Sequence, residues 1–285
     1  MHRGATLVDR PVARAGRRRR RLTAATAPPQ GRLWEVDAAR TAAILMMVVY
    51  HAGYDVNLLG PSVDIDPFSG GWRALQVACG SSFLFVVGVS LAISNARGRA
   101  RGLAGWPLYR RHLRRAAQVA AAALLVTLVT WIALGDDYVR FGILHCIAVA
   151  MVVGPLLLPL GPVNLILAWV ALLAGMALLR GPESDIPGLL VVGVPLEGGA
   201  GVDWYPLLPW LAPVLVGLAV GRALYPGGVR GPWGARLPTP PWAREVGAPG
   251  RHALPIYLVH QPVLIPLVLA ALAIAGVEVS LDEFR

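Results

Sequence analysis

The segment from Arg32 to Asp55, RLWEVDAARTAAILMMVVYHAGYD, decides the fold of this chain. It begins with charged residues, continues as an unbroken apolar run from Thr41 to Tyr50, and ends on His51 and Asp55. His51 and Asp55 are four positions apart, so a helix would place them on one face. An apolar span with ionisable groups at both ends indicates a membrane helix with a functional role.

The composition predicts an integral membrane protein. Of the 285 residues, 56% are hydrophobic and only 15% are charged, and the mean hydropathy of +0.59 is too high for a soluble domain of this size. All 26 basic residues are arginine, which is typical of a GC-rich bacterial genome. The arginines flank apolar runs and form no nucleic-acid-binding motif, so the net charge of +10 does not indicate a nucleic acid partner.

Both cysteines, Cys79 and Cys146, lie inside apolar runs. This placement favours packing over a disulfide framework or a cysteine-based metal site. We therefore expect no metal ion.

Seven apolar runs are long enough to cross a bilayer, at about 20 residues each. They cover approximately residues 38–59, 72–95, 113–134, 139–160, 163–179, 206–224 and 252–277. We predict an all-α polytopic membrane protein with about seven transmembrane helices. Of the 26 arginines, 22 lie in alternate connections, namely residues 1–40, 97–115 and 222–251. Because arginine marks the cytoplasmic side, the N-terminus is predicted to be cytoplasmic and the C-terminus outside.

The predicted domain organisation has three parts. Residues 1–31 contain the run Arg17–Arg21 without apolar periodicity, which predicts a disordered basic cytoplasmic tail. A twin-arginine signal is the alternative, although no apolar segment directly follows the arginines. Residues 32–277 form the transmembrane domain, and residues 278–285 form a short acidic external tail.

Four polar residues near the predicted outer face are candidates for catalysis or substrate binding. A carboxylate one turn away, Asp55, can orient His51 as a general base. His145 lies at the same predicted depth in the motif RFGILH and could assist, while Arg140 opens that motif and could bind substrate. The plain alternatives are a helix end in headgroup water, an interfacial anchor and a hydrogen bond within the bundle.

The motif DWYPLLPW, residues 203–210, leads into the sixth predicted span. Asp203 could bind a polar acceptor, and Tyr205 and Trp210 could stack on a sugar ring. An aromatic belt with proline at a helix start is the alternative interpretation.

Two further features lie in the last two predicted spans. His260 is about eight residues past the cytoplasmic end, or about 12 Å deep, where an imidazole needs a partner or a pathway. It is therefore a further candidate for substrate binding. The pair Gly217 and Gly221 indicates close helix packing.

Four arginines at the predicted cytoplasmic face, Arg40, Arg114, Arg115 and Arg251, could bind an anionic cofactor through bidentate hydrogen bonds. Binding to anionic lipid is the alternative.

Five motifs together resemble a known family. They are VDAAR…MMVVYHAGYD, SSFLFVVGVSLAIS, RFGILHCIAV, DWYPLLPWLAPVLVGLAVGR and GRHALPIYLVHQP. In order and spacing they resemble the catalytic domain of heparan-α-glucosaminide N-acetyltransferase, specifically its short bacterial members, over residues 32–262. The resemblance implies a polytopic acyltransferase that takes acetyl from cytosolic acetyl-CoA to an acceptor across the membrane. It also implies an essential histidine in the loop after the first helix, where residues 57–71 contain none.

We therefore predict a membrane-embedded acyltransferase that moves acetyl from cytosolic acetyl-CoA to an amine or hydroxyl of an envelope sugar or glycan on the outer side. The expected location is the bacterial inner membrane. Its expected partners are acetyl-CoA, the glycan acceptor and membrane lipids, with a homodimer as one option. The alternatives are a small transporter or proton-coupled carrier with a relay of buried histidines, and a non-catalytic membrane subunit of an envelope-polysaccharide complex.

Overall fold

The structure is a computed structural model that describes residues 31–234 and 238–280. The predicted basic tail, apart from its last residue, lies outside the described residues. So does the predicted acidic tail from residue 281 onward.

Apolar helices dominate the described residues, and no strand is present among them. The main helices are α2 (Trp34–Leu59), α3 (Gly70–Ala100), α4 (Gly105–Leu134), α5 (Ile143–Leu157), α6 (Val163–Leu178), α7 (Leu207–Leu224) and α10 (Ala253–Ile274). Two short helices, α8 (Ala243–Val246) and α9 (Ala248–Arg251), precede α10. The prediction of an all-α polytopic membrane protein is confirmed.

Six of the described helical segments are long and apolar enough to cross a membrane, by length and composition. They correspond to α2, α3, α4, α5, α7 and α10. The remaining predicted span, residues 163–179, is the apolar helix α6, which has 16 residues. This is shorter than the stretch of about 20 residues that a bilayer usually requires. The orientation of the termini remains a prediction.

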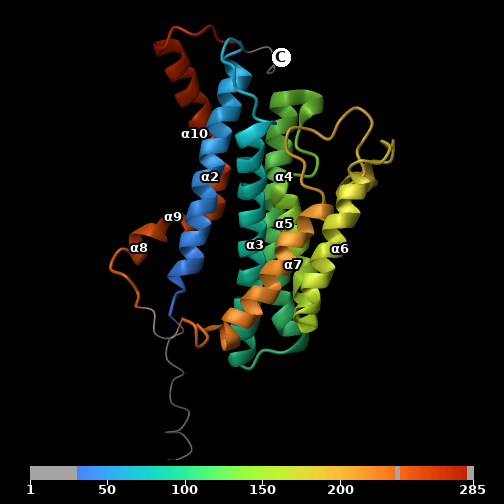
Figure 1. Ribbon diagram of the computed structural model, residues 1–285, viewed down its shortest axis with the longest axis vertical. Coiled ribbons are helices and arrows are strands. Elements are labelled where there is room, and N and C mark those ends of the chain that lie inside the picture. Colours follow the sequence, from blue (N-terminus) through green and yellow to red (C-terminus); the bar gives the residue numbers. More distant parts are fainter. Residues whose placement is uncertain (1–30, 235–237, 281–285) are drawn as a thin grey trace, which may run out of the picture. The chain divides into compact units, whose positions relative to one another are not determined.

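Helix α3 packs between α2 and α7, and α6 packs on α7 (Figure 1). The contact between α3 and α7 is close because glycines line it. A Cβ atom added to Gly88 would overlap the carbonyl oxygen of Val214, and one added to Gly217 would overlap the carbonyl oxygen of Phe85. Gly221 lies on the same seam, where a Cβ would come within 2.9 Å of Ala92 Cβ. The predicted packing role of the Gly217–Gly221 pair agrees with this geometry.

Candidate functional site

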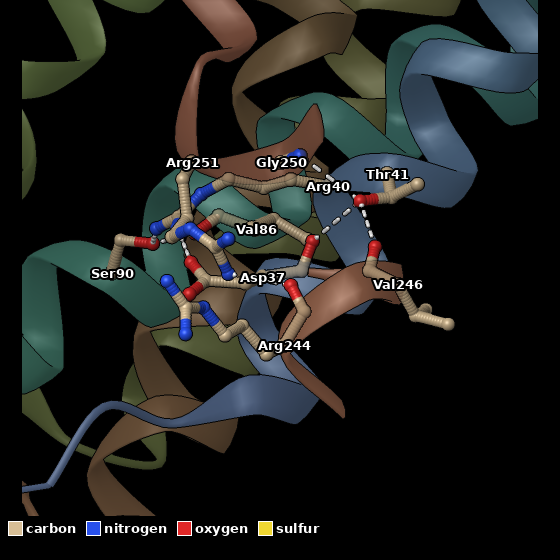
Figure 2. Close-up of polar contacts among 9 residues, drawn as sticks. All are labelled: Asp37, Arg40, Thr41, Val86, Ser90, Arg244, Val246, Gly250 and Arg251. Atoms are coloured by element: carbon tan, nitrogen blue, oxygen red, sulfur yellow. Dashed lines mark hydrogen bonds and ion pairs between the residues drawn. The ribbon is translucent and has the colours of Figure 1, made fainter. Parts of the chain in front are cut away.

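Three arginines gather at the amino-terminal end of α2 around one buried carboxylate (Figure 2). Asp37 is 4% exposed, and its Oδ1 forms an ion pair of 2.8 Å with Nη1 of Arg40. Arg40 Nη2 also donates to Ser90 Oγ at 2.5 Å. Arg251 Nη1 donates to the carbonyl oxygen of Arg244 at 2.9 Å. Figure 2 draws the guanidinium groups of Arg244 and Arg251 beside Asp37. We call Arg40, Arg244 and Arg251 the arginine cluster. Its excess positive charge suits a phosphate-bearing ligand.

A hydroxyl on α2 holds the segment that carries Arg244 and Arg251. Thr41 Oγ1 donates to the carbonyl oxygen of Val246 at 2.7 Å and accepts the backbone N–H of Gly250 at 2.9 Å (Figure 2). A Cβ atom at Gly250 would overlap the carbonyl oxygen of Asp37, so only glycine allows this approach. Thr41 therefore places α8 and α9 against α2, and with them two of the three arginines.

A cavity of about 240 Å³ lies between α2, α3, α4, α5 and α10. Arg40, Arg115, Ser90, Ser94 and His112 are its polar lining residues. Most of the rest is apolar or aromatic, including Phe83, Val119, Met151 and Tyr257. Phe83 and Ser94 are eleven positions apart on α3, so the cavity extends about 16 Å along this helix. Because Arg40 belongs to both features, the cavity adjoins the arginine cluster.

Two histidines meet where α2 contacts α10. The rings of His51 and His260 have centroids 4.7 Å apart and an interplanar angle of 77°. His51 Nδ1 lies 2.8 Å from the carbonyl oxygen of Met47, and His260 Nδ1 bonds to the carbonyl oxygen of Tyr257. A carbonyl can only accept, so each Nδ1 carries the proton and each Nε2 keeps its lone pair. Tyr257 also lines the cavity, which places the histidine pair about one helical turn beyond it.

Asp55 bonds to Gln261 instead of the expected His51. It is 1% exposed, and its Oδ1 accepts Nε2 of Gln261 at 2.9 Å. His51 Nδ1 is already bonded to the backbone of α2. Met47, rather than Asp55, therefore sets the tautomer of His51, which corrects the expected contact.

His145 forms its hydrogen bonds with α4 and the start of α5. Its Nδ1 accepts the backbone N–H of Gly142 at 3.2 Å, at the start of α5. Its Nε2 lies 3.4 Å from Thr127 Oγ1, and that hydroxyl donates to the carbonyl oxygen of Val139 at 2.7 Å. Both ring nitrogens are thus used to join α4 to the start of α5. The structure does not support the expected assistance of His51 by His145, because equal depth does not bring two residues to the same side of a bundle.

Asp203 closes the amino-terminal end of α5. Its Oδ2 accepts the backbone N–H of Ile143 at 3.1 Å, where the helix dipole favours a negative charge. Tyr205 is 8% exposed and packs on Trp210, with ring centroids 4.5 Å apart. The structure shows internal contacts for all three residues. Their binding to a sugar remains a prediction.

Burial raises the pKa of Asp203 to about 6, against an ordinary value of 3.8, and the bond from Ile143 opposes this shift. The folded protein therefore binds this proton more strongly than the unfolded chain, and stability falls as the pH rises from about 4 to about 6. Asp203→Asn keeps an acceptor for Ile143 but cannot ionise. We expect the variant to lose less stability over this range in thermal melts at each pH. Identical pH dependence in both proteins would contradict this assignment.

The remaining predicted arginines separate into two groups. Arg114 and Arg115 are both exposed, and of the two only Arg115 is among the cavity-lining residues. Arg140 lies with Cζ 4.5 Å from the centre of the Tyr138 ring. This cation–π contact suits the alternative of an interfacial anchor, and substrate binding by Arg140 remains a prediction.

Sequence reasoning missed several polar residues of the site, among them Arg244, Ser90, Ser94 and His112. His112 is 1% exposed, and neither of its ring nitrogens has a hydrogen-bond partner among the described residues. Helical spacing could have found it, because His112, Arg115 and Val119 share one face of α4 and all three line the cavity.

Six helical segments long and apolar enough to cross a membrane, with a partly polar cavity between helices that Arg40 and Arg115 help to line, are typical of a multi-pass membrane protein. Residues 32–262 match the family model of heparan-alpha-glucosaminide N-acetyltransferase, catalytic, and the chain belongs to this family. The resemblance of the five motifs is confirmed, and the protein is a membrane acyltransferase-like protein. No curated protein and no solved structure matches the chain.

Proposed function

We propose that the protein transfers an acetyl group from acetyl-CoA to an amine or hydroxyl of an envelope sugar or glycan across the bacterial inner membrane. The family supports acyl transfer. The observation that carries the proposal is the cavity, which begins at Arg40 and Arg115 and reaches Tyr257, beside the His51–His260 pair. It extends from the arginines to Tyr257, whose ring centroid lies 5.3 Å from that of His260.

The donor binds in two parts. Its phosphates pair with the arginine cluster and Arg115, because guanidinium groups bind phosphate through charge-assisted hydrogen bonds. The cavity of about 240 Å³ is smaller than the sites of 300–1,000 Å³ typical of whole drug-sized ligands. It therefore receives only the narrow pantetheine arm, and the nucleotide stays at the arginines. The thioester points toward Tyr257.

His51 supplies the general base. Its Nδ1–H donates to Met47, so Nε2 takes the proton from the attacking amine or hydroxyl as that group bonds to the thioester carbonyl carbon. The carbon–sulfur bond breaks, and the CoA thiolate recovers the proton from the imidazolium. An acetyl-histidine formed on Nε2 is the other route with the same overall balance.

Adjacent arginines provide a matched test of the donor site. Arg115→Gln should weaken CoA binding about tenfold, because a hydrogen bond to a charged group contributes about 1.5–3 kcal/mol. Arg114→Gln should leave the Kd within about twofold, because Arg114 does not line the cavity. Titration of purified protein with CoA in detergent measures both values.

Two outcomes of that titration would contradict the proposal. One is an absence of saturable CoA binding by the unmodified protein. The other is an equal loss of affinity in both variants, which would indicate a general effect of surface charge.

A further inference from the structure

Two buried polar side chains lie at the arginine end of the cavity. Ser94 lies one helical turn beyond Ser90 on α3, and Ser90 Oγ accepts Nη2 of Arg40 at 2.5 Å. His112 lies three positions before Arg115 on α4, so the two share one helix face, and both line the cavity. The pair formed by Ser94 and His112 is therefore close to the two guanidinium groups of the lining, at the end of the cavity away from the thioester.

Neither side chain of this pair has a partner among the described residues. His112 is 1% exposed and Ser94 is 8% exposed. Both ring nitrogens of His112 and the Oγ of Ser94 lack a hydrogen bond there. Ser90 shows the usual alternative for a helical serine, because its Oγ donates to the carbonyl oxygen of Val86 at 2.6 Å. Buried polar groups are almost always paired, so these unpaired groups indicate a bound ligand that accepts hydrogen bonds from them.

The charges around the pair favour an anion. Arg111 and Arg115, on the same helix as His112, are the charged groups that act on it. Arg40 lines the cavity, and no Asp or Glu is among the described residues that do so. A cation would be repelled by these arginines, and a neutral amide would leave their charge unused. A phosphate group supplies both the negative charge and several acceptor oxygens.

We propose that His112 and Ser94, with Arg40 and Arg115, form a subsite for the diphosphate of the donor, an inference that rests on the proposed function. The nucleotide stays at the arginines and the pantetheine arm enters the cavity, so the diphosphate that joins them lies at the arginine end. There an imidazole N–H and a hydroxyl each donate to a diphosphate oxygen, and the guanidinium groups neutralise its charge. The 3′-phosphate, which belongs to the nucleotide, lies outside this subsite.

The test measures the binding of four probes to the full chain in detergent. CoA, 3′-dephospho-CoA and inorganic diphosphate carry the diphosphate, whereas pantetheine carries no phosphate. The affinities of the last two probes are measured by displacement of labelled CoA. In His112→Leu, the Kd of the three diphosphate probes should rise about tenfold, because a hydrogen bond to a charged group is lost. The Kd of pantetheine should change less than twofold. Ser94→Ala should raise the same three values about threefold to fivefold.

Two further variants complete the set. His112→Gln keeps an N–H donor at this position and should recover most of the affinity that His112→Leu loses. Met151→Leu alters the same lining without changing its polarity, so all four Kd values should stay within about twofold.

Three binding results would overturn the proposal. A loss confined to CoA would assign His112 to the 3′-phosphate, and an equal loss for pantetheine would assign it to the arm or to the fold. The third is an anionic lipid such as phosphatidylglycerol that co-purifies with the unmodified protein and is lost from His112→Leu, while the Kd of CoA is unchanged. That result would assign the subsite to a lipid headgroup.

Thermal stability separates recognition from a structural role. Without ligand, His112→Leu should melt at the same temperature or higher, because the substitution removes unpaired buried polar atoms. A lower melting temperature, with no recovery of affinity in His112→Gln, would overturn the proposal. An unchanged Kd for CoA in His112→Leu would also overturn it and would leave the proposed function standing. Failure of the unmodified protein to bind CoA at all would instead overturn the proposed function.

Discussion

Replacing His51 with alanine is expected to lower acetyl transfer by about two to four orders of magnitude, which is the usual contribution of a positioned general base. The structure gives the reason. The Nδ1–H of His51 is fixed on the carbonyl oxygen of Met47, so Nε2 presents a lone pair beside His260. The measurement is transfer of labelled acetyl from acetyl-CoA to a glycan acceptor by protein reconstituted in proteoliposomes.

A second histidine variant provides the control. His252 is exposed at the start of α10, so His252→Ala should keep its activity within about twofold, as expected for a surface change. Thermal melts must show that both variants remain folded. Full activity in His51→Ala would remove His51 from the mechanism.

The largest expected effect on stability is at Gly88, on the seam between α3 and α7. A Cβ atom there would overlap the carbonyl oxygen of Val214 and would also lie 2.9 Å from Leu218 N, both on the backbone of α7. The helices can accept a larger side chain only by moving apart, which loosens the packing that holds them together in lipid. We expect Gly88→Val to lower the free energy of unfolding by about 3 kcal/mol.

Gly71 is the matched control for this substitution. It also lies in α3, but a Cβ atom there meets nothing within 4 Å. Gly71→Val should leave the melting temperature unchanged or slightly higher, because valine has the better helix propensity. Equal destabilisation of the two variants would indicate a general intolerance of α3 to valine instead of a specific seam.

The positions of the helices could be predicted because hydropathy marks the part of each helix that lies in lipid. The predicted run 206–224 corresponds to α7, which begins at Leu207 and ends at Leu224. The prediction failed where a helix continues through charge. Helix α4 begins at Gly105 instead of residue 113, because backbone hydrogen bonding extends through the arginine-rich turns that hydropathy excludes.

The depth of each site residue in the membrane could be predicted from the sequence, but not the residue that its side chain faces. Helical rise places His51 and His145 at similar depths, yet only helix packing decides which side chains face each other. That packing brings His51 to His260, at the other end of the sequence, and fixes His145 against Thr127. A single sequence contains no signal for which helices are neighbours, so the pairing was not predictable.

This arrangement also bears on the alternative of a proton-coupled carrier. That hypothesis required a relay through His51, His145 and His260. Both ring nitrogens of His145 are used at the start of α5, which leaves a pair instead of a chain of three. A carrier would move its solute unmodified, and a non-catalytic subunit would tolerate replacement of His51 and His260.

Acetyl is expected to move from acetyl-CoA on the side of the arginine cluster to an acceptor on the opposite side of the membrane. The most direct test uses proteoliposomes with protein of defined orientation, acetyl-labelled CoA outside and an amino-sugar glycan inside. We predict covalent label on the enclosed glycan when the arginine cluster faces outward, and free CoA left outside. Unmodified glycan, with the label still on CoA or carried across as an intact solute, would contradict the account.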